Sequence, residues 1–131
     1  MPTRRSVLAL AAAAALLPFA RAASAQGVQT YDPAKFAAAQ ASGQPILVEI
    51  HAVWCGTCKI QKAIIGDLVK KADLATLNIF RVDFDDQKDA VAAFGADMQS
   101  TLIVFKGKSE VGRTVGQTSG KAIESLLRLA I

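Results

Sequence analysis

The chain has 131 residues, of which 52% are hydrophobic and 20% are charged, and its formal net charge is +4. Three of its 15 basic residues are arginines within residues 1–25, which contain no acid, so the rest holds 12 basic residues against 11 acidic ones. This near balance, without a basic stripe, argues against a nucleic-acid partner.

Residues 1–25 have the pattern of an export signal. A pair of arginines is followed by an apolar, alanine-rich run over residues 7–17, shorter than the roughly 20 residues that span a bilayer. Small residues at 23–25 predict cleavage before Gln26. The arginine pair resembles a twin-arginine motif, although general secretory export stays open. We therefore expect a bacterial periplasmic protein that is not stably inserted in the membrane once the signal is removed.

Residues 26–131 are expected to form one small domain with strands and helices in the order βαβαβαββα. Hydrophobic periodicity, turn residues and helix caps define the elements. They predict strands at 28–31, 46–52, 78–84, 101–106 and 111–115, and helices at 33–41, from 55 or 56 to about 71, from 85 or 86 to 94, and after 118 or 119.

Two details of the helices are specific predictions. In the second helix, Ile60, Ile64 and Leu68 recur every four residues with Ala63 beside them, which predicts that they face inward. In the last helix, the expected inward residues are Ile123, Leu126, Leu127 and Ala130. Asp85 or Asp86 is expected to cap the third helix, and Gly95 to end it.

The only two cysteines, Cys55 and Cys58, lie where the apolar strand at 46–52 gives way to the second helix. A thiol pair at such a corner is typical of a redox or a metal site. At a helix N-terminus, free N–H groups and the helix dipole lower the pKa of a cysteine from its free value of about 8.5. A structural disulfide that closes so short a loop adds little stability, so the pair is better suited to reversible chemistry.

This order, with Trp-Cys-Gly-Thr-Cys-Lys at residues 54–59, resembles the thioredoxin superfamily over residues 28–131. The strand before the motif, the apolar strand at 101–106 and Val-Gly at 115–116 match the family pattern as well. The resemblance implies an α/β thioredoxin fold, a central mixed sheet flanked by helices. The chain departs from the family in three places: Gly-Thr separates the cysteines, Glu49 replaces the usual Asp, and Ser100 replaces a cis-proline.

By this resemblance, Cys55 is the exposed attacking thiolate, and Cys58, more buried, resolves the mixed disulfide. Burying an unpaired carboxylate is expensive. By resemblance to the family's buried acid, Glu49 would take the proton of Cys58 through a water. The alternative for Glu49 is an edge or surface carboxylate without a role. A weaker suggestion couples Glu49 to Arg81, which is near the place of a family lysine.

The resemblance also implies a substrate surface. Trp54 would flank the thiols, and Gln99, Ser100, Thr101 and Gly116 would line the groove for a peptide segment. A cis bond before a non-proline residue costs about 2.5–4 kcal/mol, so we expect the Gln99–Ser100 peptide to be trans.

Two further side chains have open roles. His51, the only histidine, stands four residues before Cys55, where it either tunes the thiols or fills an aromatic's packing place. Lys59 either helps to hold the thiolate or projects into solvent.

These residues predict an exported thiol–disulfide oxidoreductase that acts on protein disulfides or thiols and needs no bound cofactor. The closeness of the motif to thioredoxin itself favours a reductase, which in the envelope would need a membrane thiol electron donor. The alternative is a copper or zinc carrier module that uses both cysteines and His51. Three ligands are one short of a closed structural zinc site, and we expect no metal.

Overall fold

The computed structural model describes residues 27–131, so the predicted export signal lies outside the described residues. Five strands form one sheet in the order β1-β3-β2-β4-β5. β1 (Gln29–Thr30), β2 (Pro45–His51) and β3 (Asn78–Asp83) run parallel, while β4 (Thr101–Lys106) pairs antiparallel with β2 and with β5 (Ser109–Val115). The predicted element order is confirmed, with one added 3-10 turn at Leu74–Thr76.

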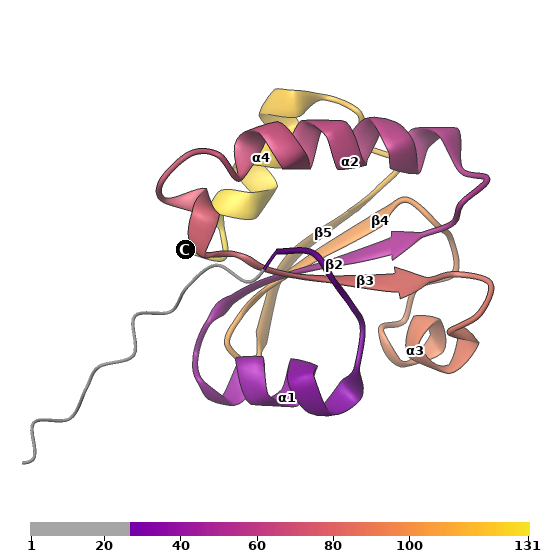
Figure 1. Cartoon of the computed structure of the whole chain (residues 1–131), viewed down its shortest axis with the longest axis horizontal. Helices are drawn as coiled ribbons and strands as arrows, with labels where there is room; N and C mark the ends of the chain where they lie inside the picture. Colours follow the sequence, from indigo (N-terminus) through magenta and orange to yellow (C-terminus); the bar gives the residue numbers. More distant parts are fainter. Residues whose placement is uncertain (1–26) are drawn as a thin grey trace, which may run out of the picture.

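Helices cover both faces of this sheet (Figure 1). α2 (Gly56–Leu68) and α4 (Gly120–Arg128) lie on one face, and α1 (Pro33–Ala41) and α3 (Lys88–Ala93) lie on the other. None of the described helices is long and apolar enough to cross a membrane. The loop from β2 to α2 lies at the carboxyl end of β2, beyond the two layers of helices (Figure 1).

Two apolar clusters hold the layers together, because successive side chains of a strand point to opposite faces. Leu47, Leu102 and Val104 face α2 and α4, while Val48 and Ile103 face α1 and α3. The inward residues predicted for α4 are confirmed: Ile123, Leu126, Leu127 and Ala130 are all buried on the first of these faces.

The inward face predicted for α2 is confirmed at Leu68 and wrong elsewhere, because the helix is rotated about its axis relative to the prediction. Ile60 is 50% exposed, Ala63 is exposed, and Ile64 is only partly buried. The other buried residues of α2 are Cys58, Gln61 and Ile65. Both sets have helical spacing, so periodicity alone allowed either. The contacts of Cys58 and Gln61 with neighbouring strands and loops select the observed one.

The helix caps follow the sequence in part. Asp32 and Ser119 cap α1 and α4 through their side chains, as expected, and Gly95 follows α3 with a φ of 63°. The predicted caps of α3 are wrong, because Gln87 takes that position without a side-chain bond. The backbone N–H groups of the two expected caps instead donate to Asp83 Oδ1, which turns the chain at the end of β3.

Candidate active site

The thiol pair lies at the corner between β2 and α2. Cys55 is the N-cap of α2, and its Sγ accepts a hydrogen bond of 3.0 Å from the backbone N–H of Cys58. The two cysteines form a disulfide, with their Cα atoms 5.3 Å apart. The sulfur of Cys55 therefore lies where the free N–H groups of the helix favour negative charge.

Both cysteines are buried, with 4% of each residue exposed. The greater exposure expected for Cys55 is therefore absent in this disulfide-bonded state. Ala52 and Phe84 pack against the pair, and the Ser100 hydroxyl lies 3.4 Å from Cys55 Sγ. These contacts cover the disulfide, so an incoming partner must reach Cys55 from the rim of the site.

Glu49 is buried below the pair, on the face of β2 that α2 covers, with 6% of the residue exposed. It lies opposite Arg81 in the parallel register of β2 and β3. Arg81 donates two hydrogen bonds to Glu49 Oε2, from Nε at 3.0 Å and from Nη2 at 2.8 Å. The suggested coupling to Arg81 is confirmed, and the alternative of a surface position for Glu49 is wrong, because the residue is buried and a guanidinium balances its charge.

Glu49 also lines a small cavity. Oε1 is buried and has no hydrogen-bond partner among residues 27–131. The cavity measures about 10 Å³, and its walls include Glu49, Cys58, His51 and Gln61. That volume is at the lower limit for one water molecule. The structure thus brings Glu49, the predicted proton acceptor, and Cys58, the predicted resolving cysteine, to the walls of one cavity.

His51 ends β2 and is half-buried beside the same cavity. Burial is the main cause that lowers its pKa below the ordinary value of 6.5, and the positive charge of Arg81 lowers it further. Glu49 and Asp83 oppose this shift only in part. The imidazole is therefore neutral at pH 7.

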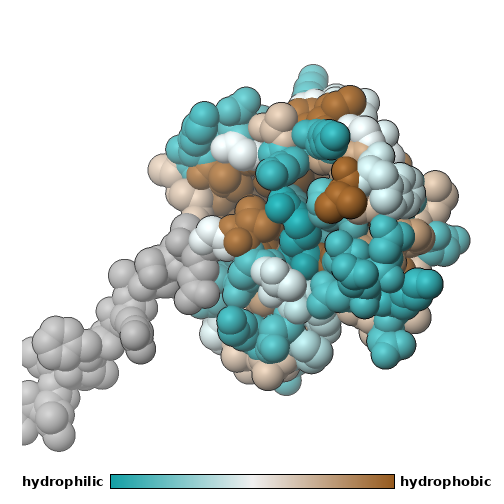
Figure 2. Space-filling model, turned by 45° about the vertical axis from the view of Figure 1, so that its right-hand side comes forward, coloured by the Kyte–Doolittle hydropathy of each residue, from teal (hydrophilic) through white to brown (hydrophobic). Residues whose placement is uncertain are grey.

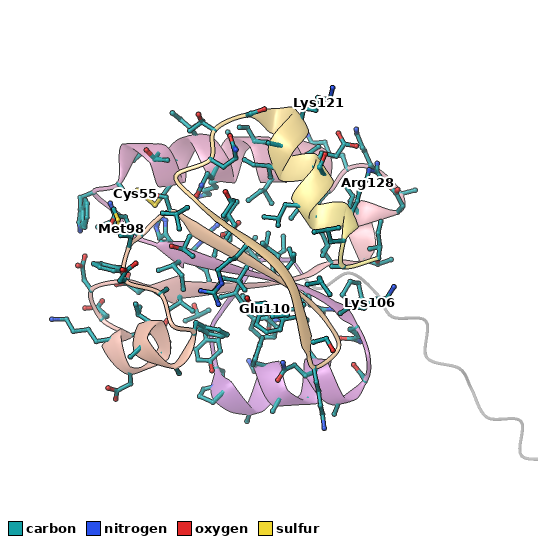
Figure 3. The ribbon with its side chains drawn as sticks, turned by 180° about the vertical axis from the view of Figure 1, so that it is seen from behind. Cys55, Met98, Lys106, Glu110, Lys121 and Arg128 are labelled. Carbon is teal, nitrogen blue, oxygen red and sulfur yellow. A yellow bond between two sulfur atoms is a disulfide. The ribbon has the colours of Figure 1, made fainter. Side chains whose placement is uncertain are left out.

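Exposed apolar side chains surround the corner. Trp54 is 58% exposed, and its Nε1–H donates a hydrogen bond of 2.7 Å to Asp85 Oδ2. Val53, Ile60 and Met98 are also about half exposed or more. Figure 3 shows Met98 beside Cys55, and Figure 2 brings this end forward as separate brown patches among teal side chains. The rim thus offers apolar surface for a partner to contact.

The segment before β4 adopts an unusual backbone conformation. No peptide bond among residues 27–131 is cis, so the predicted trans bond between Gln99 and Ser100 is confirmed. Ser100 has a φ of 56°, the only positive φ of a non-glycine residue in the described part of the chain. Such a conformation costs an L-residue with a side chain roughly 1–2 kcal/mol. The serine is therefore held there by its surroundings.

The other predicted substrate residues lie around Ser100. The Gly116 N–H donates to the Ser100 carbonyl at 2.9 Å, which brings the two proposed groove segments together. Gln99 is half-buried. Thr101 is 2% exposed, and its hydroxyl donates to the Met98 carbonyl at 2.7 Å, so this side chain stabilises the loop rather than facing a partner.

Gln61 is a site residue that the sequence reasoning missed. It is 3% exposed, and its Nε2 donates to the Ser100 carbonyl at 3.1 Å and to the Gln117 carbonyl at 3.0 Å. The one available signal was its place three residues after Cys58, on the same face of the helix. Lys59, in contrast, is exposed.

The metal-carrier alternative finds no donor set in the part of the chain that the structure describes. No group of three or more His, Cys, Asp or Glu side chains there is arranged to hold a metal ion. Cys55 and Cys58 are already bonded to each other, so His51 has no thiolate partner beside it.

Comparisons with known proteins agree with this site. The thioredoxin family matches residues 27–128. A thioredoxin of Chlamydia muridarum is 36% identical over 102 residues, which cover 78% of this chain and 94% of the relative. Trxlp of Edwardsiella tarda, a solved structure, is 41% identical with a TM-score of 0.74, covering 76% of this chain and 97% of that one. The chain therefore belongs to the thioredoxin family, has the thioredoxin fold, and is a thiol–disulfide oxidoreductase with Cys55 and Cys58 as its redox-active pair.

Proposed function

We propose that this oxidoreductase reduces disulfides of protein substrates in the bacterial cell envelope. The observation that carries the proposal is the Cys55–Cys58 pair, closed at the N-terminus of α2 and surrounded by exposed apolar side chains. A helix N-terminus stabilises the thiolate that disulfide exchange requires, and apolar surface suits contact with flexible protein segments.

In the reducing direction, the Cys55 thiolate attacks one sulfur of the substrate disulfide. A bond forms between Cys55 and that sulfur, the substrate S–S bond breaks, and the other substrate sulfur leaves as a thiolate. Cys58 then loses its proton and attacks Cys55 Sγ, which forms the protein disulfide and releases the second substrate sulfur. The substrate gains two electrons, and the dithiol of the protein loses them.

Glu49 is the proposed acceptor of the Cys58 proton. One carboxylate oxygen is held by Arg81, and the other has no hydrogen-bond partner among residues 27–131. Glu49 and Cys58 line the same cavity. A water in that cavity would carry the proton from the thiol to the carboxylate. General base catalysis of this kind contributes roughly 10²–10⁴-fold to a rate.

The envelope location rests on the sequence of residues 1–25. In an oxidising compartment the protein needs a supply of electrons, for which we propose a membrane thiol electron donor as partner. Electrons pass only between sulfur atoms in this chemistry, so no bound cofactor is required.

Reduction of insulin by the purified protein, with dithiothreitol as electron source, tests the activity. We expect turnover in the wild type and none in Cys55→Ser, while Cys58→Ser accumulates a mixed disulfide with the substrate. Absence of turnover in the wild type would contradict the proposed substrate class.

The reduction potential against glutathione tests the direction. A reductase is expected near the value of about −270 mV that is typical of thioredoxin. A value near about −120 mV, typical of a strong oxidant, would reverse the proposed direction.

Cell fractionation tests the compartment. The full chain with a C-terminal epitope tag is expected in the periplasmic fraction, with Gln26 as the N-terminal residue. Replacing both Arg4 and Arg5 by Lys is expected to leave the precursor in the cytoplasm. Export that persists in this variant would assign the general secretory route, and an uncleaved cytoplasmic wild type would contradict the envelope location.

A further inference from the structure

The Ser100 hydroxyl donates a hydrogen bond to the sulfur of the attacking cysteine. Ser100 Oγ lies 3.4 Å from Cys55 Sγ, and both groups are buried. Cys55 is bonded to Cys58 and therefore has no S–H to donate. The hydroxyl is thus the donor, and Cys55 Sγ accepts from two groups, this hydroxyl and the backbone N–H of Cys58.

Bonds that do not involve the cysteines fix the backbone that carries this hydroxyl. The Ser100 N–H donates to the Ile50 carbonyl at 2.8 Å, and the Ser100 carbonyl accepts from Gly116 N–H and from Gln61 Nε2. Opening the disulfide breaks none of these bonds. The Ser100 backbone therefore stays beside Cys55 when the pair is reduced and keeps the hydroxyl within reach of the sulfur, which is then a thiolate.

The backbone at Ser100 also indicates a role for its side chain. Glycine adopts a positive φ at the lowest cost, yet a serine occupies this position with a φ of 56°. Strained residues of this kind are held in place by their surroundings and gather at active sites. The strain at Ser100 places a hydroxyl on the reacting sulfur, which a glycine could not do.

Gln61 is the side chain that supports this arrangement. Its amide is buried and donates to the carbonyls of Ser100 and Gln117, so it ties two loops to the first turns of α2. The same helix carries Cys55 at its N-cap. Gln61 therefore fixes the distance between the loop that carries the hydroxyl and the helix that carries the sulfur.

We propose that Ser100 is a catalytic residue whose hydroxyl stabilises the Cys55 thiolate, and that Gln61 is the positioning residue that holds Ser100 in its strained conformation. The inference rests on the disulfide exchange proposed above at Cys55. Hydrogen bonds to charged groups are stronger than those between neutral groups, so the hydroxyl favours the thiolate over the thiol.

Titration of the reduced protein, followed by thiolate absorbance, tests the role of Ser100. We expect Ser100→Ala to raise the midpoint for Cys55 by about one pH unit, with a roughly tenfold slower alkylation by iodoacetamide below that midpoint. Ser100→Gly removes the hydroxyl and also relieves the strain, and it should give the same shift. Ser109→Ala, on the exposed hairpin, is the matched control and should shift nothing.

An unchanged midpoint in both Ser100 variants would overturn the catalytic role. The titration needs no substrate, so its result is independent of the insulin assay. Failure of the proposed protein-reductase function would leave the shift intact, and failure of this inference would leave insulin turnover intact.

A double-variant cycle tests the role of Gln61. Gln61→Met keeps the length of the side chain without its N–H groups, and it should raise the midpoint by less than Ser100→Ala does. If Gln61 acts through Ser100, adding Gln61→Met to Ser100→Ala produces no further shift. A full additional shift in the double variant would overturn the positioning role.

Discussion

At the scale of single residues, the ion pair beneath the thiols gives the first prediction. Removing one partner of a buried pair leaves the other charge uncompensated, which costs about 3–5 kcal/mol. Arg81→Ala leaves the Glu49 carboxylate as such an uncompensated charge, because its side chain is 8% exposed and, within residues 27–131, it accepts hydrogen bonds from Arg81 alone. We expect the free energy of unfolding in urea at pH 7 to fall by that amount.

The double replacement Glu49→Leu with Arg81→Met is the control for this pair. Two apolar side chains of similar volume need no charge compensation, so most of the lost stability should return. The disulfide oxidoreductase activity should stay low in this double variant, because the proposed proton acceptor is gone. A loss below about 1 kcal/mol in Arg81→Ala would place the pair among weak surface ion pairs instead.

The lowered pKa of His51 leads us to expect that the free energy of unfolding depends on pH. Its pKa is lowered in the folded protein by burial and by the charge of Arg81, while the unfolded chain takes up the proton near pH 6.5. The stability that this residue contributes is therefore fully present above pH 6.5 and is lost as the pH falls through the lowered folded value. Urea unfolding at pH 7.5 and pH 5.0 should show a larger loss in the wild type than in His51→Phe. Equal losses in the two proteins would contradict this assignment.

At the scale of the elements, two glycines predict opposite results for the same substitution. Gly66 lies inside α2, and a Cβ there meets nothing within 4 Å. Gly66→Ala should raise the free energy of unfolding by up to about 1 kcal/mol. Gly107, in the turn between β4 and β5, has a φ of 58°, and its Cβ would lie 3.3 Å from Gly43 Cα. Gly107→Ala should lower that free energy by about 1–2 kcal/mol.

Thermal unfolding of the two variants measures both effects. The unfolding midpoint of the wild type is expected to lie below that of Gly66→Ala and above that of Gly107→Ala. Thiolate titration of Gly66→Ala is a second measurement, and it tests whether α2 keeps its geometry around the thiols. Its midpoint should equal that of the wild type. A destabilised Gly66→Ala protein would show that the middle of α2 has a close contact absent from the structure.

The same two elements show how far sequence patterns reach. Strand and helix positions followed from periodicity and turn residues, since each depends on neighbours within a few positions. The phase of α2 did not follow, because Ile60 and Ile65 belong to two overlapping apolar stripes. The choice between them depends on Gln61, whose partners lie 39 and 56 residues away in the chain.

At the scale of the whole molecule, α4 closes the core over one face of the sheet. Leu127 is fully buried in the cluster shared with α2, while Leu129, two residues later, is 52% exposed. Leu127→Ala should therefore lower the free energy of unfolding by about 2–5 kcal/mol. Leu129→Ala should change it by no more than about 0.5 kcal/mol. Urea unfolding of the two variants compares them, and similar losses would contradict the observed packing of α4.

Sequence patterns predict the parts of the candidate site that lie within one short segment. They do not predict the contacts that join segments distant in the chain. The thiol pair and its helix N-terminus are contained in one short segment. Glu49 was recognisable as a carboxylate in an apolar strand, but its guanidinium partner lies on the neighbouring strand. The positive φ of Ser100 depends on three bonds to other segments, and a proline-to-serine difference alone indicates only that the loop has changed.

The distant contacts of the thiol pair have a consequence for the timing of its reactivity. The contact between Cys55 and Ser100 spans 45 residues, and the bond from Gln61 to Gln117 spans 56. Closing such loops is an entropic cost that late, cooperative steps of folding must overcome. A chain that ends before Ser100 still carries both cysteines, but neither the hydroxyl nor the loop that surrounds them. Its thiols would react as ordinary cysteines, and the reactivity of the enzyme would arise only when the segment from Ser100 onward has folded.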